Sequence, residues 1–497
     1  MKITHFLYSS RGMRALPLVW AAAPVALLLS IFMLVLVISG ADAISAWSSP
    51  ALLIASAAAL VIARSHGALT RRSLRLGFAR SASQLLPAVV MLIFISTVAT
   101  TWMLSGVVPT LMDYGIRMLN PQMFLIVTCA VCSLVSVLTG SSWSTIATIG
   151  LAFMGIGTVL GFSPAWIAGA VISGAYFGDK VSPLSDTTVV ASSACGVNIF
   201  HHIRYLMLTS VPAMLIAMGV YGFVGLTVEA PTHIESMEIL HHLESNFNIS
   251  VWTLLIPVLT ITLIVMRINT TLTLAISSLM GLAGIFVFQP ELAARLTAEA
   301  GGSGAAAVAG LLWDATTFDS GYELFDSLVA TSGILGMTST IALVLSAMIF
   351  GMVMIGTGAL STITRAITSR LRNRFPVIAT TVGSGLFLNS CTADQYLSII
   401  IGGNMFRDAY RRTGMEPRLL SRTLEDSVSV TSVLIPWNSC GVTHSAVLGV
   451  ATVAYFPFCI FNYMSPIMTL VLAYTGLGIR KSVRGGAGPV RATSARA

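Results

Sequence analysis

The chain has 497 residues, of which 55% are hydrophobic and only 9% are charged. Soluble domains carry about 25% charged residues, so this composition excludes an ordinary soluble globular protein. The formal net charge of +8 does not indicate a nucleic-acid-binding protein, because the basic residues lie in short loops between long apolar runs.

Apolar segments long enough to cross a bilayer follow one another along the chain, which predicts an all-α polytopic membrane protein. The run 17–39 follows basic residues as in a signal peptide, but it is too long for the apolar core of one. We therefore expect the first transmembrane helix there. At about 20 apolar residues per crossing, about ten transmembrane helices are expected, near 17–39, 50–64, 84–111, 164–198, 203–226, 250–266, 271–289, 329–357, 423–443 and 446–474.

Two further apolar stretches, 123–161 and 376–404, are interrupted by small and polar residues. A cytoplasmic N-terminus places 24 of the 27 Lys and Arg residues on the cytoplasmic side, as the positive-inside rule requires. The acidic loop 227–249 then lies outside, and the basic tail 476–497 inside. Basic clusters flank 376–404 on both sides, so this stretch is predicted to be a re-entrant hairpin from the cytoplasm. The same counting of membrane crossings predicts that 123–161 is a hairpin that enters the membrane from the outside.

The two halves of the chain carry similar features at a nearly constant spacing. Residues 1–226 and 250–475, joined by the loop 227–249, are therefore interpreted as an inverted repeat with one broken helix in each copy. Such repeats recur in secondary transporters, whose sites lie near the bilayer midplane where broken helices meet. The paired features are Ser105-Gly106 with Ile355-Gly356, residues 140–143 with residues 389–392, and Gly178-Asp179 with Glu425-Asp426.

The strongest local signal is the segment 178–188, in the broken helix near 164–198. It holds Asp179, Lys180 and Asp186 within a long apolar region. A charge at the bilayer centre costs at least about 2.5 kcal/mol, so three of them indicate function. Pro183 breaks the helix and frees carbonyl oxygens for a cation. Further hard oxygen ligands are expected from Ser182, Ser185, Thr187 and Thr188.

Other polar positions in apolar surroundings are predicted to join this site. One hairpin turn is small and hydroxyl-rich, and the other adds a carboxylate, while the broken helix near 423–443 contains two more. Simpler interpretations are a helix-packing patch of small residues at 140–145, an Asp179–Lys180 pair at a helix end, and capping of a cytoplasmic helix start by Glu425 and Asp426. The candidate residues are Gly140, Ser141, Ser142 and Trp143 at one turn, Asn389 and Asp394 at the other, and Glu425 and Asp426.

Histidine and cysteine residues give weaker signals. His201 and His202 are expected to be solvated at the cytoplasmic interface, while His444 is a candidate for a proton path. The six cysteines, including Cys129 and Cys132 within an apolar run, indicate neither a disulfide framework nor a zinc site.

The segment 178–188 resembles the G-D-K-x-S-P-L-S-D-T-T signature of the NhaC-type Na+/H+ antiporter family. Residues 140–143 resemble the G-S-S-W hairpin of that family, and the stretch 389–410 and Pro436-Trp437-Asn438 are similar to it too. Ser144 departs from the family, whose members more often have Gly there. The resemblance covers nearly the whole chain. It implies an inner-membrane antiporter with paired hairpins and an elevator-like motion of the domain that bears the site.

These patterns predict a secondary transporter that exchanges Na+ for H+, not an enzyme, with no cofactor and Na+ held by Asp179, Asp186 and Ser141. An Na+/H+-coupled exchanger of small carboxylates such as malate and lactate is the main alternative, because some members of the family transport these. An intramembrane aspartyl protease and a simple channel are less favoured. Lipid is the expected environment, a homodimer is one of the states that the sequence allows, and the partner of Lys180 is left open between Asp179 and Asp186.

Overall fold

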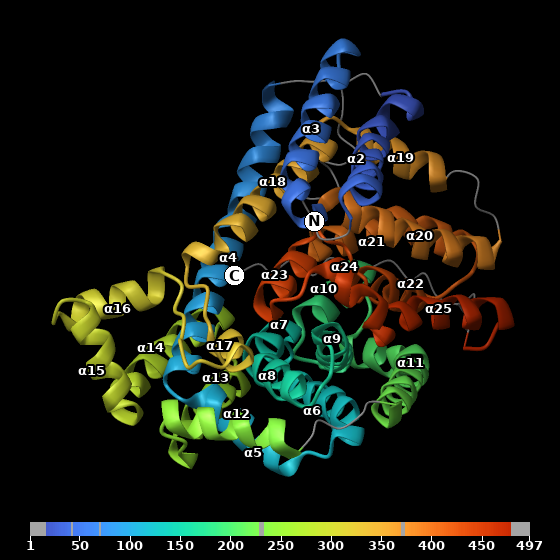
Figure 1. The fold of residues 1–497 in the computed structure, drawn as a ribbon. Helices are drawn as coiled ribbons and strands as arrows, with labels where there is room; N and C mark the ends of the chain where they lie inside the picture. Colours follow the sequence, from blue (N-terminus) through green and yellow to red (C-terminus); the bar gives the residue numbers. More distant parts are fainter. Residues whose placement is uncertain (1–15, 41–42, 69–70, 228–232, 369–372, 479–497) are drawn as a thin grey trace, which may run out of the picture.

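A computed structural model describes residues 16–40, 43–68, 71–227, 233–368 and 373–478 (Figure 1). These residues form helices and a single isolated β-bridge, between Thr316 and Thr331. Seven of the described helices are long and apolar enough to cross a membrane, or up to ten if each bent helix pair is one span. The predicted all-α polytopic membrane fold is confirmed.

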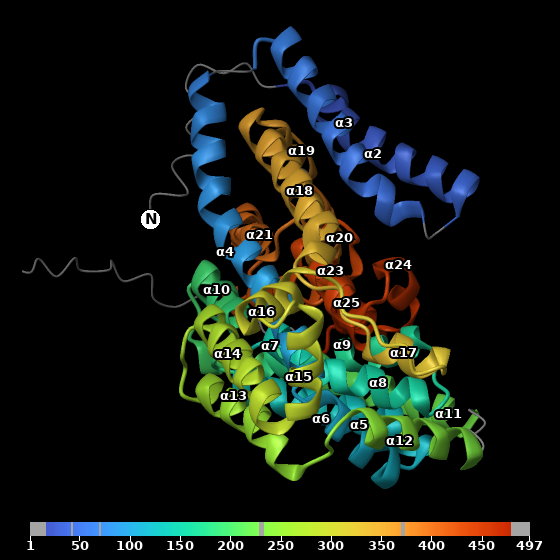
Figure 2. The ribbon, with the colours of Figure 1, turned by 60° about the vertical axis from the view of Figure 1, so that its left-hand side comes forward.

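The first helices form one side of the molecule with two helices from the second half. α2 (Leu18–Ser39) packs on α3 (Ala43–Ser65), which contacts α18 (Thr338–Gly356). α4 (Arg71–Leu104) runs between α18 and α14 (Thr270–Phe288), as Figure 2 shows. The helix predicted at 84–111 is therefore α4, which begins earlier than predicted, at Arg71, and ends earlier, at Leu104. Gly106 takes a left-handed conformation (φ 82°), and α5 (Val107–Met118) continues after a bend of 64°.

The first hairpin and the broken helix that follows it occupy the centre. α6 (Phe124–Thr139) turns at Gly140 into α7 (Ser142–Thr145), a π-helical turn (Ile146–Gly150) and α8 (Leu151–Val159). α9 (Pro164–Val181) packs closely along α6. Gly174 and Gly178 permit this close approach, because a side chain at either position would collide with the α6 backbone. After a break come α10 (Asp186–Cys195) and α11 (Ile199–Thr227).

The connection between the halves contains more helix than predicted. The acidic loop expected at 227–249 contains α12 (His233–Asn246), whose Ile239, Leu240 and Leu243 are buried at helical spacing. The crossing predicted at 329–357 begins only at Thr338, after a short 3-10 turn (Leu335–Met337). Further helices of this region are α13 (Leu255–Val265), preceded by a 3-10 turn (Val251–Leu254), α15 (Pro290–Glu299), α16 (Gly304–Trp313) and α17 (Glu323–Val329).

The second hairpin consists of α20 (Arg374–Thr392) and α21 (Gln395–Arg412), preceded by α19 (Ala359–Thr368). The crossings predicted at 423–443 and 446–474 are wrong in their bounds. The second broken helix comprises α22 (Pro417–Leu424), a π-helical segment (Glu425–Ser429), a 3-10 turn (Ser432–Leu434) and α23 (Ser439–Leu448). Short turns (α24, Thr452–Tyr455, and Phe456–Phe458) then lead to α25 (Ile460–Thr475).

Corresponding helix ends recur at a constant spacing of 253 residues, from the first hairpin to the end of the broken helix. The register inferred from the sequence was therefore wrong: Asp179 corresponds to Ser432, and not to a carboxylate of the pair Glu425-Asp426. The carboxylates of the two broken helices therefore do not occupy equivalent positions, because the helix ends recur at 253 residues and the charged residues do not. The inverted orientation and the domain bounds stay predictions. The matching ends are Thr139 and Thr392, Pro164 and Pro417, Ser185 and Asn438, and Gly196 and Gly449.

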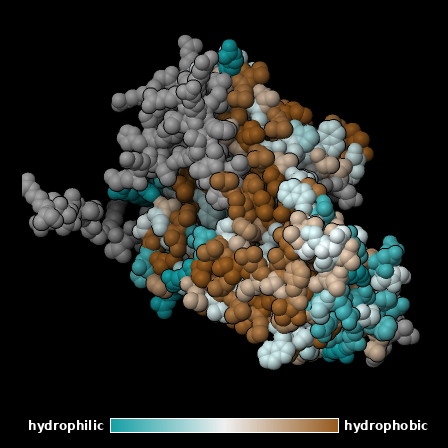
Figure 3. Space-filling view, turned by 90° about the vertical axis from the view of Figure 1, so that its left-hand side faces the viewer, coloured by the Kyte–Doolittle hydropathy of each residue, from teal (hydrophilic) through white to brown (hydrophobic). Residues whose placement is uncertain are grey.

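The outer surface is apolar over a broad area. Figure 3 shows hydrophobic side chains over much of one face. Val19, Met33, Leu215 and Phe223 are each more than 60% exposed. Large exposed patches of this kind are unfavourable in water but suit contact with lipid.

Candidate functional site

A cavity of about 400 Å³ lies where both hairpin turns meet both broken helices. Its lining includes residues of α7, α10, α23 and the start of α21, helices that lie near the centre of Figure 1. Segments far apart in the sequence thus contribute to one site. Its described lining consists of Met91, Gly140, Ser141, Trp143, Asp179, Asp186, Thr187, Asn269, Thr270, Thr271, Asp394, Gln395, Tyr396 and Ser439.

Asp179 is the most deeply buried carboxylate of the cavity, with 9% of its surface exposed. It lies in the last turn of α9, which ends before Pro183. The Ser142 hydroxyl donates a hydrogen bond of 2.7 Å to its Oδ2. The first hairpin is therefore tied directly to the broken helix, and none of the ion pairs between described residues includes Asp179.

Asp186 and Thr187 begin α10, which Ser185 caps through a 3.4 Å contact with the Thr188 N–H. Asp186 is exposed and lines the cavity, so the cavity is open there. The Ser185 and Thr187 hydroxyls share a hydrogen bond of 3.0 Å. An acidic residue in the first turn of a helix interacts favourably with the helix dipole.

In each hairpin turn a side chain caps the N-terminus of the following helix, but the capping residue differs between the two turns. Ser141 caps α7 through the Ser144 N–H (3.2 Å), and Asp394 caps α21 through the Leu397 N–H (2.7 Å). One carboxylate oxygen of Asp394 is thereby occupied. The second hairpin therefore adds a half-buried, partly satisfied carboxylate to the cavity.

The charge of the cavity favours a cation. Its described lining contains three carboxylates and no Lys, Arg or His. Four helix N-termini also converge on it, and such ends attract anions. However, each of these ends is capped by its own side chain, namely Ser141, Ser185, Asp394 and Asn438. The carboxylates therefore dominate.

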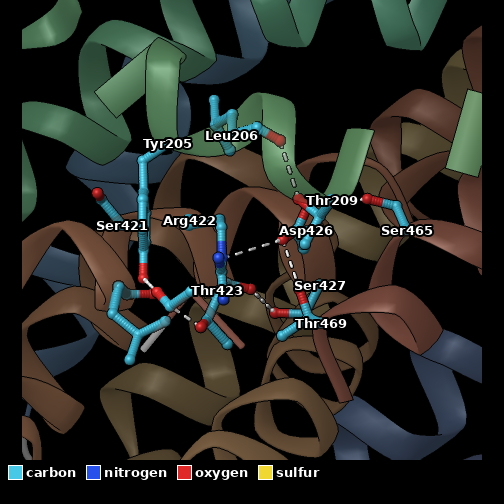
Figure 4. Close-up of polar contacts among 12 residues, drawn as sticks. Tyr205, Leu206, Thr209, Ser421, Arg422, Thr423, Asp426, Ser427, Ser465 and Thr469 are labelled. Carbon is cyan, nitrogen blue, oxygen red and sulfur yellow. Dashed lines mark hydrogen bonds and ion pairs between the residues drawn. The ribbon is translucent and has the colours of Figure 1, made fainter. Parts of the chain in front are cut away.

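Lys180 faces away from the cavity and forms an ion pair with Asp426 of the π-helical segment. The partners considered from the sequence, Asp179 and Asp186, were both wrong. Both members of the pair are at most 1% exposed. Figure 4 shows Asp426 among the hydroxyls of Thr209, Ser465 and Thr469, which donate over 3.1, 2.8 and 2.5 Å. Asp426 is thus fully satisfied as an anion.

Arg422 is fully buried, although the sequence placed it in a cytoplasmic loop. Its guanidinium lies 4.5 Å from the Tyr205 ring centre, and its Nε lies 4.0 Å from Asp426 Oδ2 (Figure 4). Glu425 and Asp426 follow the last turn of α22, so they do not cap a helix start. This cluster is separate from the lining of the cavity.

Ser182 and Asn389 were also predicted to belong to the site, but they do not line the cavity and instead form hydrogen bonds to backbone carbonyl groups. Ser182 donates to the Val137 carbonyl (2.8 Å), and Asn389 donates to the Val428 carbonyl (2.7 Å). Asn269, Thr270 and Thr271 line the cavity but were missed. Their polar run between two apolar stretches was the available signal.

Two of the histidines are buried. His202, expected to be solvated, contacts the Ser421 hydroxyl at 2.8 Å, whereas His201 is exposed. His444 contacts the Tyr176 hydroxyl at 3.1 Å and lies edge-on to Trp143 of the first hairpin. His444 therefore borders the site without lining the cavity.

Comparison with known proteins is consistent with this arrangement. The profile of the Na+/H+ antiporter family matches residues 8–205 and 174–477. The Na(+)/H(+) antiporter NhaC of Alkalihalophilus pseudofirmus is 37% identical over 390 residues, covering 78% of this chain and 82% of the relative. The Malate-2H(+)/Na(+)-lactate antiporter of Bacillus subtilis is 32% identical over 79% of this chain and 81% of the relative. The arginine/ornithine antiporter ArcD of Halobacterium salinarum is 32% identical over 84% of both. The chain belongs to the Na+/H+ antiporter family.

Proposed function

We propose that this protein exchanges Na+ for H+ across the bacterial inner membrane, with both termini in the cytoplasm. The observation that carries the proposal is the cavity with three carboxylates and, among its described lining residues, no basic side chain. Two relatives named as Na+/H+ antiporters support it.

Exchange follows from competition between Na+ and protons for the same carboxylates. Asp179 and Asp186 bind Na+ when ionised and lose it when protonated. Ser141 and the Ser142 hydroxyl, which already contacts Asp179, supply neutral oxygens nearby. Burial penalises an ionised carboxylate that has neither ion nor proton, so the empty charged site is the form least able to cross the membrane. No cofactor is needed for this cycle.

Exchange of small carboxylates is the second candidate, because four helix N-termini face the cavity and one relative is named for malate and lactate. The caps on these helices and the three carboxylates of the lining weigh against an anionic substrate. Arg422, the fully buried arginine, contacts Tyr205 and Asp426 and lies outside the described lining.

The test uses inverted membrane vesicles from a host without its own Na+/H+ antiporters. Respiration acidifies the vesicle interior, and a pH-sensitive dye then reports proton release when NaCl is added. We expect dye recovery with the wild type, a weaker apparent affinity for Na+ as the pH falls, and no recovery with Asp179→Asn.

Asp408→Asn is the matched control, because Asp408 is exposed on α21 and lies outside the cavity. It should transport like the wild type. Recovery driven by malate or lactate, but not by Na+ alone, would replace the proposal by the second candidate. Undiminished exchange by Asp179→Asn would refute the role of the cavity.

A further inference from the structure

Glu425 is a fully buried carboxyl group that does not line the cavity. It begins the π-helical segment between α22 and the second break, and its exposed fraction is 0%. Neither Oε1 nor Oε2 has a hydrogen-bond partner in the part of the chain that the structure describes. None of the ion pairs between described residues includes Glu425. An isolated carboxylate is strongly disfavoured in such a position, so the arrangement fits a carboxyl group that carries a proton.

The adjacent carboxylate, Asp426, has the opposite environment. It receives Lys180 and three hydroxyl groups, which satisfy an anion. Adjacent carboxyl groups in contrasting environments take different protonation states, and therefore different roles. Asp426 holds Lys180 in place, whereas Glu425 is free to gain or lose a proton.

Glu425 is linked to the cavity through the buried ion pair. Lys180, which follows Asp179 in α9, pairs with Asp426, which follows Glu425. An empty, ionised Asp179 disfavours a second negative charge on Glu425. A Na+ ion at Asp179 removes that repulsion, while Lys180 favours the ionised form of Glu425. Binding of Na+ therefore promotes loss of the proton.

Of the elements packed against this segment, α20 and α21 place their charged groups at its periphery, whereas α22 carries the fully buried Arg422, whose Nε lies 4.0 Å from Asp426 Oδ2. The basic residues of α21 are exposed at its C-terminal half, and α20 carries its single charged residue at its start. The described part of α25 has no Asp, Glu, Lys, Arg or His. The titratable groups of these elements are Asp186 and Cys195 on α10, Arg374 and Cys391 on α20, Tyr396, Arg407, Asp408, Tyr410, Arg411 and Arg412 on α21, Arg418 and Arg422 on α22, and Tyr463 and Tyr474 on α25.

We propose that Glu425 is a second proton-carrying group of the transporter, which releases its proton to water when Na+ binds at Asp179. This inference rests on the proposed Na+/H+ exchange and extends it. Coupling then has two parts: direct competition at Asp179, and displacement of a proton from a separate carboxyl group behind the cavity.

The test measures proton release and Na+ binding together on the purified full-length protein. NaCl is added in weakly buffered detergent solution with a pH indicator, with choline chloride as the salt control, and bound ²²Na+ is counted in parallel. Glu425→Gln mimics the protonated side chain. We expect it to bind Na+ but to release fewer protons per bound Na+ than the wild type. Glu299→Gln, at an exposed site, should match the wild type.

An unchanged ratio of protons to Na+ in Glu425→Gln would overturn the inference, and so would loss of Na+ binding, which would place Glu425 in the Na+ site itself. If the wild type neither binds Na+ nor releases protons, the proposed function fails instead. Infrared difference spectra provide a second readout that does not need the Gln variant to fold. Na+ should remove a protonated-carboxyl band from the wild type, and Glu425→Asp should shift that band; an unshifted band would contradict the assignment.

Discussion

The first hairpin turns at Thr139, Gly140 and Ser141, and the second turns at Thr392, Ala393 and Asp394. In both, a left-handed residue ends one helix, the next residue caps the following helix, and the threonine hydroxyl closes the turn. The cavity-lining aromatic residues Trp143 and Tyr396 follow at the same spacing. The backbone geometry is therefore shared between the two halves.

The ionisable residues of the broken helices are not shared. Asp179 corresponds to Ser432, Lys180 to Val433, and Asp426 to Ser173, each 253 residues away in the sequence. The first half thus supplies the buried cavity carboxylate, and the second supplies the counter-ion of Lys180. The comparison indicates that the two halves share their backbone geometry but differ in their charged residues. The charged residue of the first half, Asp179, lines the cavity, whereas that of the second half, Asp426, supports the structure through its ion pair.

The largest effect is expected from breaking the buried ion pair. Asp426→Leu leaves the Lys180 ammonium buried without a counter-ion, which should lower the free energy of unfolding by about 3–5 kcal/mol. Denaturant unfolding of the purified protein measures this. The double variant Lys180→Met/Asp426→Leu should recover part of the loss, because it removes both charges of the pair but leaves Arg422 beside the vacated position. A single variant as stable as the wild type would show that the pair is not a structural support.

A smaller effect is expected from the close packing of α6 and α9, which depends on glycine. A Cβ at Gly178 would collide with the Ser133 carbonyl, whereas the corresponding position in the second half, Thr431, carries a side chain. Gly178→Ala should cost about 1–3 kcal/mol through overpacking. Thermal unfolding of this variant is compared with Gly219→Ala, where a Cβ meets nothing within 4 Å. Equal stability of the two variants would argue against the close contact.

The smallest effect distinguishes the two turns. The Thr392 hydroxyl makes contacts of 2.9 Å to the Asp394 carbonyl and 2.7 Å to Ser398, whereas the contacts of Thr139 with Ser141 and Thr145 are 3.5 and 3.4 Å. Thr392→Val should therefore cost about 1 kcal/mol, and Thr139→Val less. Parallel denaturation curves would show the difference, and the reverse order would contradict it.

Much of the fold followed from apolar run length, since a bilayer requires long apolar helices. The hairpin turns and the segment 178–188 followed from small residues and charges in apolar surroundings. The sequence could not reveal the partner of Lys180, because Asp426 lies 246 residues away. Only the packing of α9, α11 and α25 brings Lys180, Thr209 and Ser465 to the Asp426 carboxylate. Arg422 was misplaced for a similar reason: a basic residue near a helix end looks solvated until Tyr205 and Asp426 are found beside it.

The division of roles between the cavity and the buried pair is tested most directly by ²²Na+ binding to two purified variants. Asp179→Asn removes the cavity carboxylate, and Lys180→Met/Asp426→Leu removes the buried pair without leaving the Lys180 charge unpaired. The predicted result is loss of saturable Na+ binding in Asp179→Asn and retained binding in the double variant. Retained binding in Asp179→Asn together with its loss in the double variant would contradict the account, because it would move the Na+ site from the cavity to Asp426.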